Sequence, residues 1–202
     1  YIINEGAKNL TSTLKSIQHE FEMRKDIMAR PAAISYMVND HGSISPVIDS
    51  NHYMLTEHSE SQLMGRAGIP KLYMDKMLDY GLNDLAINNL NAMTAKTMKD
   101  GVLVRHVNGW IKGWLSPSYK RMDASPIFEA FIDKSIKAGF VPYQGRNTDY
   151  RYQLSFIYPH VFSPTPQEFI VFGLSLITGD YGGTALELNL LALRITCLNL
   201  PM

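Results

Sequence analysis

RHVNGWIKGWLSPSYKR, residues 105–121, contains an Asn-Gly pair between two runs of strand-forming residues. The first run is Val102 to Val107 and the second is Trp110 to Leu115. An Asn-Gly pair at this spacing is typical of a two-residue β-hairpin, because both central residues of the tight turn need a positive φ. The sequence therefore predicts an antiparallel hairpin over residues 102–115.

Side chains alternate between the two faces of such a hairpin. The predicted core face holds a mostly apolar set: Val102, Val104, His106, Ile111, Gly113 and Leu115. Three cross-strand pairs form the predicted outer face: Val107 with Trp110, Arg105 with Lys112, and Leu103 with Trp114. Because like charges directly opposite each other are unfavourable, Arg105 and Lys112 require an anionic or aromatic neighbour.

Two interpretations of the outer face are open. Cations that alternate with aromatic rings suit a nucleic-acid strand, because cations neutralise phosphates and flat rings stack on bases. Alternatively, the cations turn outward into water and the tryptophans cover a hydrophobic edge. Residues 116–123, SPSYKRMD, follow directly and add Tyr119, Lys120 and Arg121 to the same neighbourhood.

Apolar residues recur at helical spacing in the first half of the chain. The first such pattern predicts a helix that ends near Ala29, before Pro31, with the apolar stripe Leu10, Leu14, Ile17 and Phe21. Turn residues predict a shorter extended stretch over residues 32–55. Residues 56–100 predict three helices. Their expected starts are Thr56, Pro70 and Asn83, and Gly68 and Gly81 are expected to end the first two.

After the hairpin, the spacing of apolar residues changes from that of a helix to that of strands. Ser125-Pro126 starts one more predicted helix, which Gly139 ends. Alternating or continuous apolar runs then predict strands over residues 150–158, 168–178 and 184–198. Since helices cluster early and strands late, the sequence predicts a single α+β domain over residues 1–202, with N-terminal helices packed on a mainly antiparallel β-sheet.

Composition narrows the class of protein. The chain has 202 residues, with 19 Lys and Arg balanced by 19 Asp and Glu, so nucleic-acid binding would depend on a local patch. The single cysteine, Cys197, excludes an internal disulfide and favours an intracellular setting. No stretch predicts a membrane-spanning helix or a signal peptide. We therefore expect a cytoplasmic protein without a membrane partner.

The sequence lacks a recognisable catalytic motif. Its six histidines are scattered, and none forms a helix-face metal pair. Residues 179–183, GDYGG, lack the following Lys-Ser/Thr and helix start of a phosphate-binding loop, so a hairpin turn explains them better. Cys197 lies in an apolar run, where a buried, inert thiol is the usual outcome. We expect no enzymatic activity, no metal and no cofactor.

Arg194 is a lone cation in the apolar run 190–198. Burial of its guanidinium would be costly unless a carboxylate pairs with it. Glu187 and Asp180 are the expected partners, and ligand binding is the less favoured interpretation.

The order of several short segments resembles one family throughout. These segments are Leu55-Thr56-Glu57-His58 leading to Gln62-Leu63, Gly68-Ile69-Pro70 with Tyr73, Asn88-Asn89-Leu90-Asn91, Val104-Arg105, Leu115 to Asp123, and Arg194 to Asn199. From about Leu14 to its last residue, the chain is similar to the phage/plasmid-like protein family, a domain of unknown function carried by phages and plasmids. It departs from the family pattern at Thr178-Gly179-Asp180 and at Asn199-Leu200-Pro201.

The resemblance implies a mobile genetic element in a bacterial host, and it brings no established catalytic residue. It also implies, by analogy of fold, a similarity to phage single-strand annealing proteins, in which a β-ribbon groove holds one DNA strand and subunits form a ring or filament. On this hypothesis, the chain is a homo-oligomer that binds single-stranded DNA and promotes strand annealing in recombination. The groove would contain Arg105, Trp110, Lys112, Trp114, Tyr119, Lys120 and Arg121, extended by Arg146 and Arg151.

A function of a different class stays open beside this one. The chain would be a non-enzymatic phage protein that binds a host or virion protein, with exposed Trp110 and Trp114 as anchors. The two hypotheses differ in their dependence on salt, because only contacts to phosphates weaken steeply as the salt concentration rises.

Overall fold

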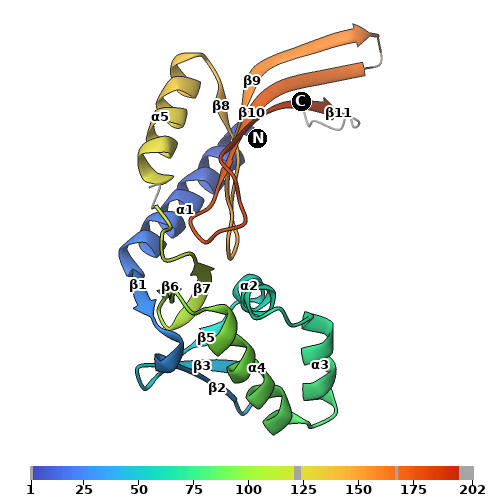
Figure 1. Cartoon of the computed structure of the whole chain (residues 1–202). Coiled ribbons are helices and arrows are strands. Elements are labelled where there is room, and N and C mark those ends of the chain that lie inside the picture. The colour runs from blue at the N-terminus through green and yellow to red at the C-terminus, as the bar shows by residue number, and fades with distance from the viewer. Residues whose placement is uncertain (1, 121–123, 167, 196–202) are drawn as a thin grey trace. The chain divides into compact units, whose positions relative to one another are not determined.

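The structure is a computed structural model that describes residues 2–120, 124–166 and 168–195 (Figure 1). Helices and mainly antiparallel strands make up the described chain, which confirms the α+β class. Where the sequence predicts a single domain, the chain forms two compact units. Unit 1 comprises residues 1–19 and 122–202, and unit 2 comprises residues 20–121.

Unit 2 contains two sheets. The four-stranded sheet has the order β1-β6-β7-β5, and its strands are β1 (Arg24–Ala29), β6 (Val102–Val107), β7 (Trp110–Leu115) and β5 (Met54–Leu55). Its neighbouring strands are antiparallel except β5 and β7, which are parallel. The three-stranded sheet consists of β2 (Ile34–Val38), β3 (Ile44–Ile48) and β4 (Asn51–His52), after a 3-10 turn at Pro31–Ala33.

The hairpin predicted over residues 102–115 is confirmed as β6 and β7. Asn108 and Gly109 form its turn with φ values of 49° and 81°, as a two-residue turn of this kind requires. Val107 pairs with Trp110 beside the turn, as expected.

The register beyond the turn differs from the predicted one. Lys112 is an extra residue in β7, a β-bulge, so Arg105 pairs with Gly113 and Val104 with Trp114. A shift of one residue exchanges the two faces of a strand, and Trp114 therefore lies on the core face instead of the outer face. The expected pairing of Arg105 with Lys112 does not form.

Three helices follow the small sheet: α2 (Glu57–Ala67), α3 (Lys71–Asp79) and α4 (Asn83–Thr97). The Thr56 hydroxyl accepts a hydrogen bond from the Ser59 N–H at 3.3 Å, and Gly68 ends α2 with a φ of 70°. Both roles were expected from the sequence. The capping role expected of Asn83 is wrong, because Asn83 is the first residue of α4 and Leu82 takes the cap position without a side-chain hydrogen bond.

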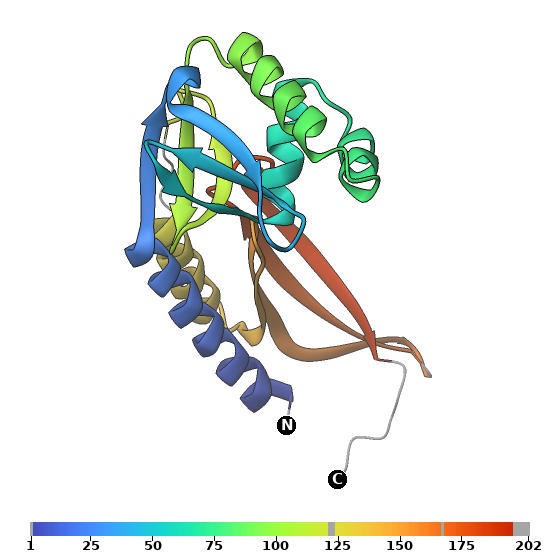
Figure 2. The ribbon, with the colours of Figure 1, turned by 90° about the horizontal axis from the view of Figure 1, so that it is seen from below.

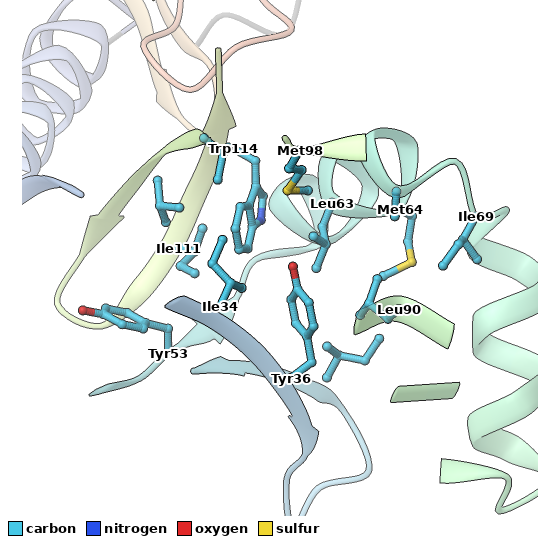
Figure 3. Packing of buried hydrophobic residues seen from close by; sticks show 14 of the residues in the cluster. Ile34, Tyr36, Tyr53, Leu63, Met64, Ile69, Leu90, Met98, Ile111 and Trp114 are labelled. Atoms are coloured by element: carbon cyan, nitrogen blue, oxygen red, sulfur yellow. The ribbon is translucent and has the colours of Figure 1, made fainter. Parts of the chain in front are cut away.

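The hydrophobic core of unit 2 lies between its sheets and its helices (Figure 3). Tyr36 from β2, Leu63 from α2, Leu90 from α4 and Trp114 from β7 are all buried there. Apolar side chains of the two sheets and the three helices therefore meet in one cluster, against which the core face of the hairpin packs.

Unit 1 contains a four-stranded antiparallel sheet in the order β11-β10-β9-β8. Its strands are β8 (Val141–Asn147), β9 (Tyr152–Thr165), β10 (Glu168–Thr178) and β11 (Glu187–Ile195). Figure 2 shows β9, β10 and β11 side by side, in orange to red. Two helices belong to the same part of the fold, α1 (Ile2–Met23), whose last turn belongs to unit 2, and α5 (Ala124–Lys137).

α1 packs against β8 at a separation that glycine permits. A Cβ atom on Gly145 would lie only 2.7 Å from the Thr13 side chain. The Gly145 N–H donates a hydrogen bond to Asn9 Oδ1 at 2.6 Å, and the Asn147 side-chain amide donates to the Ser16 hydroxyl at 3.1 Å. The expectation that the N-terminal helix packs on the antiparallel sheet is confirmed.

The predicted end of this helix is wrong. α1 ends at Met23 rather than near Ala29, because residues 24–29 form β1 and pair with β6. The helical stripe itself is confirmed in part, since Leu10 and Ile17 are buried while Leu14 and Phe21 are half-buried.

α5 packs on the same face of the sheet as α1. The ring of Phe131 meets that of Phe156 on β9 edge to face, with 5.4 Å between the ring centroids. Phe156 and Leu154 share a face of β9, and Leu154 lies opposite Gly145. One end of this sheet face is therefore covered by the two helices.

Candidate functional site

Arg105, the first predicted DNA contact, is buried in an ion pair. Its side chain is 1% exposed, and its guanidinium donates two hydrogen bonds to the Asp26 carboxylate, from Nε to Oδ1 and from Nη2 to Oδ2, each at 2.7 Å. The Tyr119 ring lies 5.5 Å from the guanidinium carbon. A guanidinium held in this way is not available to a phosphate, so the expectation of an accessible Arg105 is wrong.

Lys112 is held in a similar way. Its ammonium lies 2.9 Å from the Glu20 carboxylate, and the two side chains are 14% and 9% exposed. Because of the bulge Lys112 is not paired with Arg105, and each cation has a carboxylate of its own. Charge is thus balanced inside unit 2, and the expected cationic face is largely neutralised.

Trp114 is a core residue (Figure 3). Its backbone N–H donates to Gln62 Oε1 at 2.9 Å, and its carbonyl accepts a hydrogen bond from Arg66 Nε at 2.7 Å. Both contacts join β7 to α2. The indole N–H has no hydrogen-bond partner within the described part of the chain. The expectation that Trp114 offers its ring to a base or a protein partner is wrong.

The remaining predicted contacts differ in accessibility. Trp110 is 46% exposed beside the hairpin turn, Lys120 is exposed and Tyr119 is half-buried. Arg121 lies outside the described residues. Arg146 is exposed on β8, Arg151 is half-buried before β9, and both belong to unit 1 while the hairpin belongs to unit 2. Within the described part of unit 2, Trp110 and Lys120 are therefore the exposed residues of the predicted set.

Arg194 also has a different partner from the expected ones. Its guanidinium lies 2.7 Å from the Glu168 carboxylate, and its side chain is mostly exposed. The expected ion pair with Glu187 or Asp180 is replaced by this one, because Arg194 pairs with Ile170 near the start of β10, where Glu168 lies. Cys197 lies outside the described residues.

His106 was not singled out by its sequence context. Its ring meets that of Tyr53 at 5.0 Å between centroids, and Lys25 lies opposite it on β1. Burial lowers the pKa of His106 below the usual 6.5, and the charge of Lys25 lowers it further, while Asp26 acts in the opposite direction. The imidazole is therefore neutral at physiological pH.

The sequence analysis also did not identify an apolar surface on unit 1. We call it the β9–β11 apolar face, and it consists of Phe162, Phe172, Leu174, Leu188 and Leu190. Leu190 is 85% exposed, Leu188 is 64% exposed, and both phenylalanines are about half exposed. The cross-strand register places all five on the face that α1 and α5 cover at Leu154 and Phe156. Leu188 and Leu190 lie across the sheet from those two residues, and Phe162 and Phe172 lie farther along β9 and β10.

The β9–β11 apolar face has a polar boundary. Arg194 shares this side of β11, and its ion pair with Glu168 lies at the end of the patch. The rings of Phe162 and Phe172 contact each other, with 6.2 Å between centroids. An apolar centre with a polar rim is the usual anatomy of a protein interface. The run 186–193, LELNLLAL, is apolar at every even position, which marks one apolar face of the strand but does not show whether that face is covered.

Two observations concern other classes of site. In the ranges that the structure describes, no three His, Cys, Asp or Glu residues are grouped so that they could hold a metal ion. None of the helices in these ranges has the length and apolar character needed to cross a membrane.

Comparison with known proteins gives no assignment. No protein-family model matches the chain, and neither the search of curated proteins nor that of solved structures found a match. The resemblance to the phage/plasmid-like family and the likeness to single-strand annealing proteins therefore stay predictions.

Proposed function

We propose that this chain is a non-enzymatic binding protein that recognises a protein partner through the β9–β11 apolar face. The observation that carries this proposal is the exposure of four large apolar side chains on one sheet face: Phe162, Phe172, Leu188 and Leu190. Soluble proteins rarely expose a contiguous apolar patch of this kind unless it is an interaction site. The resemblance to the phage/plasmid-like family supports a bacterial host cell as the setting.

Capture under high salt tests this function. A tagged chain is expressed in bacteria with an untagged copy, and retained proteins are identified after washing at about 1 M salt, where screening acts within about 3 Å. We expect a defined set of proteins with the wild type and loss of that set with Phe172→Ser combined with Leu190→Ser. Leu72→Ser is the matched control, because Leu72 is 67% exposed on α3, outside the patch. Retention of the same proteins by the double variant would contradict the proposal.

Binding of single-stranded DNA is a second candidate, supported by the exposed indole of Trp110. Arg24 lies in the same cross-strand row, because Arg24 pairs with Val107 and Val107 pairs with Trp110. A ring and a cation in one row suit a base and its phosphate. This smaller surface replaces the groove predicted around Arg105 and Lys112, and strand annealing would require the same contacts.

Fluorescence anisotropy with a labelled single strand tests the second candidate. Trp110→Ala should weaken binding about tenfold, since stacking on one base contributes about 1–3 kcal/mol. Arg24→Gln should reduce the slope of log affinity against log salt by about 1. Lys96→Gln, an exposed cation at the end of α4, is the control. Equal affinity of wild type and Trp110→Ala would rule out this DNA surface.

A further inference from the structure

The described residues of the chain cover only part of the β9–β11 apolar face. The helices α1 and α5 cover the end that carries Leu154 and Phe156, both of which are buried. Leu190, across the sheet on β11, and Phe172, farther along β10, stay exposed among the described residues. The apolar layer therefore continues beyond the helices that close it, and an additional layer is needed to complete it.

The edge of the same sheet is also unprotected. β11 pairs with β10 at nine consecutive positions without a bulge, and within the described ranges it has no strand on its other side. Residues 188–193 contain no charge and no proline, and the strand's charges lie near its ends at Glu187 and Arg194. Natural edge strands usually carry charges, prolines or bulges that prevent contact with other chains. β11 lacks these devices over residues 188–193, so this side of the sheet carries nothing that would prevent contact with another chain.

We propose that a second copy of this chain covers the β9–β11 apolar face, with the two sheet faces packed against each other about a two-fold axis. This inference rests on the proposed function and names its partner. In such a dimer the same patch of both copies meets itself, as in an isologous interface. Leucine and phenylalanine side chains of two sheets interdigitate at a layer spacing of about 10 Å.

Charge favours a second copy over a strongly charged partner. The centre of the patch is uncharged, and Arg194 and Glu168 at its rim already neutralise each other. The whole chain has 19 basic and 19 acidic residues, a formal net charge of zero, so two copies do not repel each other. A highly basic or acidic protein would find no complementary charge on this face.

The size of the patch fits a reversible dimer. A large apolar side chain presents about 150–250 Å² of surface, so four of them that are between 50% and 85% exposed present on the order of 500 Å² per copy. Two copies would bury roughly 1,000 Å², which is the lower end of the range for specific interfaces. We therefore expect dimers that dissociate on dilution.

Sedimentation equilibrium over a range of protein concentrations tests the inference. We expect the wild type to change from monomer to dimer as concentration rises. Leu190→Lys should raise the dimer dissociation constant about a hundredfold, because an unpaired ammonium would be buried in the interface. Leu188→Lys, on the same face, should act in the same direction. Leu72→Lys, at a comparably exposed leucine on α3, should dimerise like the wild type.

The outcomes separate this inference from the function on which it rests. A wild-type chain that stays monomeric at all concentrations overturns the dimer, and so does a dimer that both lysine variants leave unchanged. If the chain is monomeric while capture of another protein is lost with Phe172→Ser and Leu190→Ser, the face binds a different partner. Circular dichroism of each variant checks that its fold is retained. If Leu190→Lys does not fold, the dissociation constant of Leu188→Lys tests the dimer.

Discussion

At the scale of single residues, the ion pair between Arg105 and Asp26 determines what the hairpin can do. These residues are 79 positions apart in the sequence, and their side chains meet because β1 and β6 are neighbours. Arg105, which the sequence suggested as a phosphate ligand, instead forms an ion pair that links β6 to β1. Removing it would leave a carboxylate without its partner in a partly buried position.

Arg105→Ala should therefore lower the stability of unit 2. Loss of the hydrogen bonds to the partly exposed Asp26 carboxylate should cost about 1.5–3 kcal/mol, whereas substitution of an exposed cation usually changes stability by less than about 0.5 kcal/mol. Lys25→Ala, one position from Asp26 on β1, is the exposed control. Urea unfolding followed by tryptophan fluorescence measures both variants, because Trp110 and Trp114 both lie in unit 2. Equal unfolding midpoints for the two variants would show that the pair contributes no stability.

His106 should make unit 2 sensitive to acid. Its pKa is lower in the folded chain than in the unfolded chain, because burial and Lys25 disfavour the imidazolium. The unfolded state then binds the proton more tightly, so stability falls as the pH drops below about 6.5.

We expect the urea midpoint of the wild type to fall between about pH 7.5 and pH 5.5, across the titration range of histidine. His106→Gln cannot gain this proton and should show a smaller fall. If both proteins lose the same stability over this interval, His106 is not responsible for the acid sensitivity.

At the scale of elements, the turn of the hairpin shows how local sequence determines local structure. Gly109 has a φ of 81°, and a Cβ atom there would meet nothing within 4 Å. Substitution of Gly109 is therefore unfavourable through backbone conformation alone. Gly65 within α2 also has open space around it, but its φ is not positive.

Alanine at these two glycines should have opposite effects. Gly109→Ala should destabilise unit 2 by about 1 kcal/mol, because alanine resists a positive φ. Gly65→Ala should stabilise it by about 0.5–1 kcal/mol, because alanine favours the helix. Urea unfolding compares the two variants with the wild type. If both substitutions changed the stability in the same direction, the positive φ of Gly109 would not determine the cost of a side chain at the turn.

Elements that depend on local signals were therefore predictable. The Asn-Gly turn, the Thr56 cap and the Gly68 helix end were all found from the sequence, since each acts within a few residues. The end of α1 was not found, because residues 24–29 continue a helical pattern and become a strand only through pairing with β6. A contact with a distant strand outweighed the local preference.

At the scale of the whole molecule, the fold class was predictable and the site was not. Helices early and strands late give the α+β class without any knowledge of contacts. Accessibility of a side chain depends on what covers it, and neither the carboxylate of Asp26 nor that of Glu20 stands near its cation in the sequence. The same limit hid the β9–β11 apolar face, since a period of two predicts strands but does not say which face of a sheet stays open.

The bulge in β7 has one more consequence, for changes in chain length. Without Lys112, the pairs on both sides of it would form an uninterrupted ladder, so deletion of this residue keeps Trp114 inward and Trp110 outward. Deletion of Ile111 or Gly113 would also remove the bulge, but it would place Lys112 opposite His106 or Arg105. Loss of Lys112 is therefore the deletion that removes the bulge and leaves the other cross-strand pairs of β6 and β7 in place, and it would take away the ammonium that lies 2.9 Å from the Glu20 carboxylate.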